Sequence, residues 1–102
     1  MMVYFVSRHT GALAWAATQG ITADVLLEHL EVERIAAGDW VIGSLPVNLA
    51  ARVCERGGRY FHLSLEVPQQ WRGKELSMQE MTTCGARLEE YRILKNGQGD
   101  AH

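Results

Sequence analysis

The sequence predicts a small α/β domain in which a parallel sheet of about four strands is doubly wound, with helices on both faces. Short runs of β-branched and aromatic residues alternate with stretches of helical spacing, and helix start and stop signals lie between them. The chain has 102 residues, of which 47% are hydrophobic and 22% charged, as expected of one globular domain. We expect this domain to occupy residues 1–95 and residues 96–102 to form a flexible tail.

The first half of the chain contains two expected strands and one helix. Residues 3–7 form an apolar, aromatic run that is typical of a buried strand. Thr10 is a candidate N-cap for the helix that follows, and Gly20 is a candidate stop. Residues 24–30 are expected to form the second strand. The apolar face of the helix is expected to contain Leu13, Ala16 and Ala17.

The third and fourth strands are expected at residues 40–43 and 59–66, where apolar and aromatic side chains are again concentrated. A helix is expected between them, with Pro46 in its first turn, where the missing N–H of proline has no cost. The glycine pair at residues 57–58 is expected to end this helix.

The last expected helix begins after a polar loop at residues 67–76. Ser77 and Glu80 have the spacing of a capping box, which marks a helix N-terminus. Apolar residues then continue at helical spacing and predict one helix that contains Met81, Cys84, Leu88 and Tyr91.

Composition and missing motifs exclude several classes of function. The net charge of −2 provides no attraction for a long nucleic acid, and no apolar run is long enough to span a membrane. Without a recognisable signal peptide, the expected location is cytoplasmic. The cysteines and histidines do not have zinc-site spacing, and no phosphate-loop or metalloprotease motif is present, so we expect neither a metal nor another cofactor.

Two strand-to-helix junctions contain the candidate binding and catalytic residues. Ligands of open parallel sheets bind outside the carboxyl ends of the strands, where helix N-termini present free N–H groups. At the first junction, Arg8 is suited to hold a phosphate, and His9 is suited to act as general acid or base. Other ligand contacts are expected from the remaining residues of the two junctions: Ser7, Thr10, Gly11, Ser44, Pro46 and Asn48.

Each of these residues also has a purely structural interpretation. Short polar side chains at junctions commonly satisfy local backbone groups, and Asn48 can be an ordinary first-turn helix residue. Arg8 can pair with a carboxylate such as Glu66. His29 and His62 lie in strand-like runs and are expected to be structural, whereas Trp71 in the polar loop is a candidate for stacking on a base.

The segments VYFVSRHTGALAW, GDWVIGSLPVNLAARVCERGGRYFHLSL, ELSxxEM and RLEEY resemble a small CRISPR-associated family, the accessory Csx-type proteins of type III systems. The resemblance covers nearly the whole chain. It implies a CARF-like, Rossmann-like domain that binds cyclic oligoadenylate, and a ring nuclease activity that linearises the cyclic tetra-adenylate messenger of antiviral defence. The residues agree with such a metal-independent reaction, in which a ribose 2′-hydroxyl attacks the adjacent phosphate. A homodimer is expected because a two-fold axis matches the near-two-fold symmetry of the ring.

Other functions remain open from the sequence. The same crevice suits a protein that sequesters the messenger without cleaving it. A histidine-type phosphatase has Arg-His-Gly after its first strand, but here Thr10 separates His9 from Gly11, and the chain is short for that class. A structural or protein-binding module is the third alternative.

Overall fold

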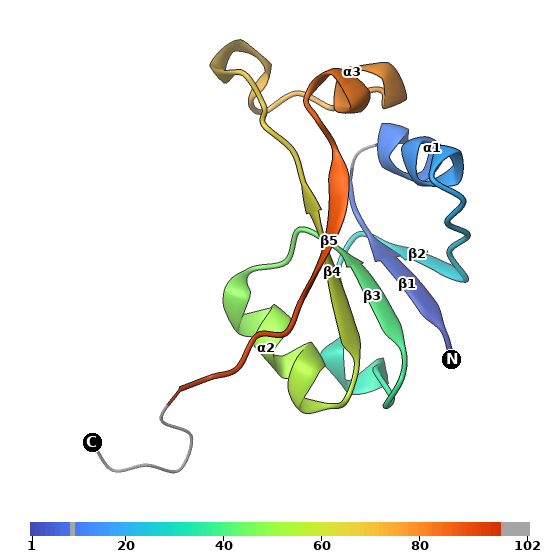
Figure 1. Cartoon of the computed structure of the whole chain (residues 1–102), viewed down its shortest axis with the longest axis vertical. Coiled ribbons are helices and arrows are strands. Elements are labelled where there is room, and N and C mark those ends of the chain that lie inside the picture. The colour runs from blue at the N-terminus through green and yellow to red at the C-terminus, as the bar shows by residue number, and fades with distance from the viewer. Residues whose placement is uncertain (9, 97–102) are drawn as a thin grey trace.

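A computed structural model describes residues 1–8 and 10–96, with the backbone alone for Thr10 (Figure 1). It is a mixed α/β fold with a five-stranded sheet in the order β2-β1-β3-β4-β5. The first four strands are mutually parallel, and β5 is antiparallel to β4. The strands are β1 (Val3–Val6), β2 (Val25–Leu27), β3 (Trp40–Gly43), β4 (Arg59–Ser64) and β5 (Arg87–Tyr91). The helices are α1 (Thr10–Thr18), α2 (Val47–Glu55) and α3 (Met78–Thr83), with short 3-10 turns η1 (Val32–Arg34) and η2 (Gln69–Trp71).

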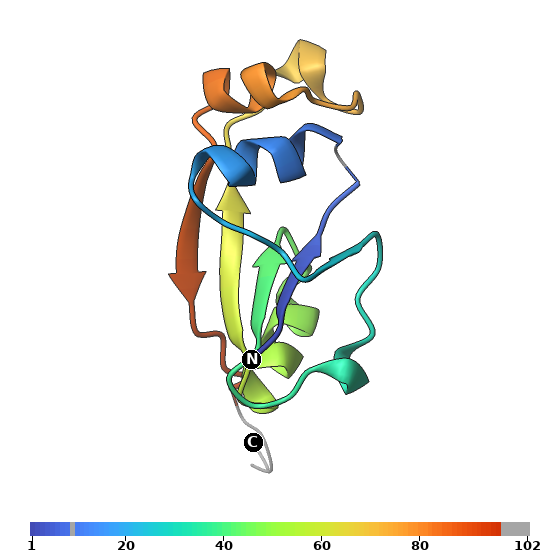
Figure 2. The same ribbon diagram turned by 90° about the vertical axis from the view of Figure 1, so that its right-hand side faces the viewer.

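Helices cover both faces of the sheet because alternate strand residues point to opposite sides. On one face, Phe5 and Leu63 pack with Trp15 of α1 and Met81 of α3. Helices α1 and α3 lie side by side there, as Figures 1 and 2 show. On the other face, α2 and the segment around η1 cover a second cluster made of Tyr4, Val6, Ile35, Val41, Ala50, Val53 and Tyr60.

The four predicted strands are present, and β1 and β3 are neighbours in the sheet. The capping box is also confirmed: the Ser77 hydroxyl accepts from Glu80 N–H, and the Glu80 carboxylate accepts from Ser77 N–H. None of the described helices is long and apolar enough to cross a membrane. Of the expected tail, residues 97–102 lie outside the described part of the chain.

The prediction of one long last helix is wrong. Helix α3 ends at Thr83, and residues 87–91 form β5 instead, so the sheet has one strand more than predicted and is not wholly parallel. Gly85 ends the helical stretch with a φ of 73°, in the left-handed region. Beyond it, Leu88 pairs with Leu63, and Glu90 accepts two 2.8 Å hydrogen bonds from the Arg59 guanidinium.

The predicted apolar face of the first helix is only partly correct. Ala16 is buried as predicted, but Leu13 and Ala17 are exposed. The buried face is formed by Ala12, Trp15 and Ala16, since the bulk of Trp15 fills the space between α1 and the sheet.

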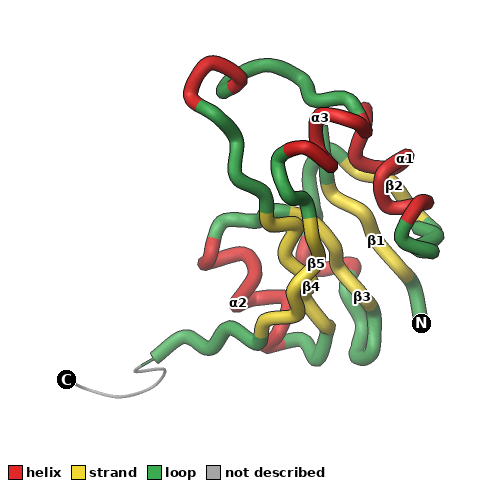
Figure 3. Tube along the Cα trace, turned by 45° about the horizontal axis from the view of Figure 1, so that its top comes forward, coloured by secondary structure: helices red, strands yellow, loops and turns green. Residues whose placement is uncertain are grey.

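Figure 3 shows the long connection from β4 to α3, which includes η2 and extends beyond the carboxyl ends of the parallel strands. Within it, Trp71 packs against the first core cluster and the Lys74 ammonium lies 5.1 Å from the centre of its ring. Lys74 also forms a 2.6 Å ion pair with Glu80. One side of the predicted stacking residue is therefore already covered by a cation.

Replacing Gly85 should destabilise the fold through its backbone conformation. An added Cβ at this position has no close neighbour, the nearest atom being 3.4 Å away, so the cost of Gly85→Ala comes from its φ of 73°. We expect a loss of about 1 kcal/mol in the free energy of unfolding, measured by urea denaturation. Gly85→Asn should lose less, because asparagine tolerates the left-handed region. Equal losses in both variants would contradict this explanation.

Candidate functional site

The two predicted junctions lie next to each other at the carboxyl edge of the sheet. Val6, the last residue of β1, pairs with Gly43, the last residue of β3. The chain then leaves β1 toward α1 on one face and leaves β3 toward α2 on the other. Segments that diverge in this way leave the sheet edge between them available to a ligand.

At the first junction, Arg8 is exposed, and no hydrogen bond or ion pair joins it to another described residue. The alternative in which Arg8 pairs with Glu66 is wrong, because Glu66 forms its 3.2 Å ion pair with Arg87. Ser7 is half-buried, and its backbone N–H donates to the carbonyl of Leu27 at 3.0 Å. The guanidinium of Arg8 is therefore the group at this junction that is available to an anion.

His9 and the side chain of Thr10 lie outside the described residues. Gly11 is buried at the start of α1, where an added Cβ would lie 2.4 Å from the backbone nitrogen of Met78. The absence of a side chain thus allows α1 to pack closely on the beginning of α3. This close packing explains the glycine at position 11, and no ligand contact is needed to explain it.

The second junction is held by hydrogen bonds to β4. The Ser44 hydroxyl donates to the carbonyl of Leu63 at 2.7 Å, so its oxygen is left to act as an acceptor. Pro46 occupies the N-cap position of α2, and no side chain of the described residues caps the first turn of this helix. Uncapped N–H groups at a helix N-terminus favour an anion.

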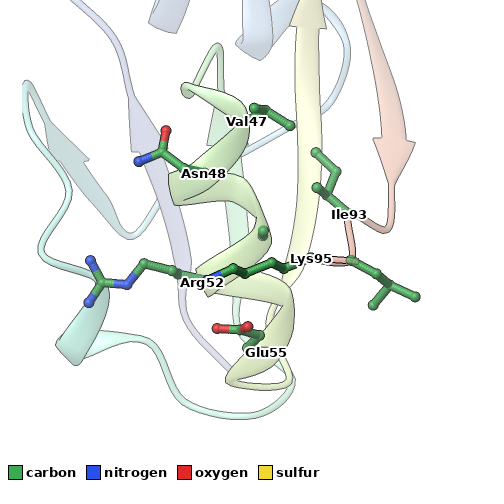
Figure 4. A pocket seen from close by; sticks show the side chains of 8 residues that line it. Val47, Asn48, Arg52, Glu55, Ile93 and Lys95 are labelled. Atoms are coloured by element: carbon green, nitrogen blue, oxygen red, sulfur yellow. The ribbon is translucent and has the colours of Figure 1, made fainter. Parts of the chain in front are cut away.

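Asn48 is exposed on α2 and lines a shallow groove of about 600 Å³ between this helix and the segment after β5. In Figure 4, Asn48 points to the opposite side of α2 from Val47 and Ile93. Arg52 lines the same groove, but its guanidinium forms a 3.0 Å ion pair with Glu33. Asn48 therefore lies beside the helix N-terminus and not between the two strand ends.

The structure adds a pair of residues at this edge that sequence reasoning did not include. Tyr60 is buried in β4, and its hydroxyl lies 2.6 Å from Nδ1 of His62. The same hydroxyl lies 3.1 Å from the carbonyl oxygen of Gly43 and 2.9 Å from the backbone nitrogen of Leu45. The available signal was the spacing of Tyr60 and His62, which places both on one face of a strand. Their link to residues 43–45 requires the fold.

The electrostatic setting of this edge is defined by burial and by local pairs. Burial is the main cause that raises the pKa of the Tyr60 hydroxyl, which keeps it protonated near neutral pH. A hydrogen bond from the Ser64 hydroxyl is the main cause that lowers the pKa of Glu89, so this residue is a carboxylate. Among the described residues, no group of three or more histidine, cysteine or acidic side chains is placed to hold a metal ion.

Residues 4–94 match the family described as "Putative CRISPR-associated protein (Cas_VVA1548)". The chain belongs to this CRISPR-associated family. The matched region begins within β1 and extends past β5, so it contains both junctions and the Tyr60–His62 pair. Comparisons with curated proteins and with solved structures give no match.

Gly11→Ala should disturb the contact between α1 and α3 more than an ordinary glycine substitution does. The added Cβ would collide with backbone atoms of residues 76–78, which have little freedom to move aside. We expect a loss of about 1–3 kcal/mol in the free energy of unfolding, measured by urea denaturation.

The matched control for Gly11→Ala is Gly20→Ala. At position 20 an added Cβ meets nothing within 4 Å, and only the positive φ of 78° is penalised. A Gly11→Ala variant as stable as the native protein would show that this contact is not tight in solution.

Proposed function

We propose that this CRISPR-associated protein is a ring nuclease that cleaves cyclic oligoadenylate, with cyclic tetra-adenylate as its main substrate, and so ends the antiviral signal of type III systems. The observation that supports this most is the guanidinium of Arg8, which has no partner among the described residues, at the edge where β1 and β3 end side by side. The uncapped N-terminus of α2 begins at the same edge. Together they form a place for a phosphodiester.

The proposed reaction is attack of a ribose 2′-hydroxyl on its neighbouring phosphate, without a metal. Arg8 binds the phosphate and stabilises the charge that develops on it in the transition state. His9 moves a proton, and Ser7 and Asn48 position the ring. The first-turn N–H groups of α2 add a favourable dipole for the phosphate.

The fold supports a CARF-like, Rossmann-like interpretation at the level of architecture. Helices lie on both faces of a mostly parallel sheet, and the neighbouring strands β1 and β3 lead to opposite faces. We propose a cytoplasmic homodimer in which two such edges grip one cyclic ligand across a two-fold axis.

A protein that sequesters the messenger without cleaving it is the second candidate. The same observation supports it, because a guanidinium and a helix N-terminus can bind a phosphate. Binding alone needs no group that accepts a proton. The two candidates differ in turnover and can be separated by one assay.

Substitution of Arg8 should abolish most of the cleavage of cyclic tetra-adenylate. Loss of a transition-state donor typically costs about 100-fold or more, so we expect this loss in Arg8→Ala, with a comparable loss in His9→Ala. The measurement is multiple-turnover conversion to linear products, resolved by chromatography with and without EDTA. EDTA should have no effect.

Arg92→Ala is the matched control, since Arg92 is exposed and follows β5 at the other end of the sheet. It should cleave as the native protein does. Binding without turnover in the native protein would favour sequestration, inhibition by EDTA would contradict the metal-free reaction, and normal cleavage by Arg8→Ala would contradict the proposed site.

The protein should be a dimer in solution when the cyclic ligand is bound. A domain of 102 residues offers one edge, whereas the ring has two equivalent halves. Size-exclusion chromatography with light scattering, with and without cyclic tetra-adenylate, measures this directly. A monomer under both conditions would contradict the dimer.

A further inference from the structure

The hydrogen bonds around Tyr60 define which nitrogen of His62 carries a proton. A tyrosine hydroxyl donates one hydrogen bond, and here it contacts the Gly43 carbonyl, the Leu45 N–H and His62 Nδ1. The Leu45 N–H must donate and the Gly43 carbonyl must accept. All three contacts are hydrogen bonds only if Tyr60 donates to Gly43 and His62 Nδ1–H donates to Tyr60. We therefore assign the hydrogen to Nδ1, which leaves a lone pair on Nε2.

The second ring nitrogen of His62 is open to the surface. No described residue forms a hydrogen bond with Nε2, and no buried side-chain nitrogen or oxygen in the described part of the chain lacks a partner. His62 is half-buried, and a buried Nε2 without a partner would be one of these atoms. Solvent therefore reaches Nε2. One nitrogen is thus fixed from within the protein while the other can meet a substrate.

His62 lies in the same row of the sheet as the ends of β1 and β3. Val6 pairs with Gly43, and Gly43 pairs with His62. Strands are about 4.8 Å apart, so Val6 and His62, which lie two strands apart in this row, are separated by about 10 Å. Gly43 has no side chain, so the β3 residue of this row adds none between Val6 and His62. A ligand that is held by the residues after β1 and spans about 10 Å would reach His62.

Several titratable groups surround His62. Glu89 of β5 is its cross-strand partner, and the Tyr91 ring lies 6.0 Å from the His62 ring. Tyr60 lies on its own strand, and Cys54 of α2 is adjacent to the main chain of Tyr91. Of these groups, Glu89 carries the charge near neutral pH and would stabilise a cationic imidazole.

We propose that His62 is the general base that removes the proton from the attacking ribose 2′-hydroxyl, and that Tyr60 is its positioning residue. This inference rests on the proposed function and deepens it. The 2′-hydroxyl proton goes to Nε2, the bond from O2′ to phosphorus forms, and the bond from phosphorus to O5′ breaks. The 5′-oxygen takes a proton, a transfer that the proposed function assigns to His9, and both histidines return to their starting states by proton exchange with solvent. The linear product ends in a 2′,3′-cyclic phosphate.

The orientation of His62 fits this role. A general base must be held in one tautomer with its lone pair toward the reacting hydroxyl, and a hydrogen bond to the other nitrogen provides this constraint. Here the Tyr60 hydroxyl, which contacts Nδ1, is itself held by hydrogen bonds to the backbone at residues 43–45.

The test uses His62→Asn, since the asparagine amide can take the place of Nδ1–H and donate to Tyr60 while Nε2 is removed. We expect single-turnover cleavage of cyclic tetra-adenylate to fall about 100-fold or more, with ligand binding and melting temperature unchanged. The pH profile of the native rate should change in the variant. Added imidazole should restore part of the activity of His62→Ala.

Further variants keep the test decisive. Tyr60→Phe should reduce the rate less than His62→Asn does, and His29→Asn, at an exposed histidine after β2, should cleave as the native protein does. If His62→Asn does not fold, His62→Gln is measured in the same way. A native rate and pH profile in a folded His62 variant would overturn this inference alone, whereas a native protein that cleaves no cyclic oligoadenylate would overturn the proposed function and the general base with it.

Discussion

The pairing of β1 with β3 is the constraint on which the candidate site depends. A Cβ added to Gly43 would lie 2.6 Å from the carbonyl oxygen of Val6, so the close approach at the ends of these strands requires glycine. Just beyond this point the chain turns toward opposite faces of the sheet, to α1 after β1 and to α2 after β3. The exposed edge, with Arg8 on one side and the α2 N-terminus on the other, follows from this divergence.

The connection from β3 to α2 is fixed by β4 from two sides. Tyr60 bonds to the backbone at Gly43 and Leu45, and Leu63 accepts the hydroxyl hydrogen of Ser44. These bonds use the polar groups that give the loop its shape and leave the first-turn N–H groups of α2 without a side-chain cap. The edge is therefore preorganised, and ligand binding need not order this loop, which lowers the entropic cost of binding.

Local patterns in the sequence were sufficient to predict the four parallel strands. They failed at residues 87–91, because the helical spacing of apolar residues continues across Gly85. Pairing with β4 stabilises a strand there instead. They also did not separate His62 from an ordinary strand residue. Its contact with Tyr60 is local, but the groups that hold Tyr60 come from the preceding strand and its loop, and only the fold brings them together.

The charged side chains differ between the β5 side and the β1 side of the carboxyl edge. On the β5 side, the carboxylates of Glu66 and Glu90 are paired with Arg87 and Arg59, and such exposed pairs add little stability but reduce the negative field. On the β1 side, Arg8 carries its charge without a carboxylate partner among the described residues. A phosphate is thus attracted toward Arg8 and the α2 N-terminus, although the whole chain has a net charge of −2.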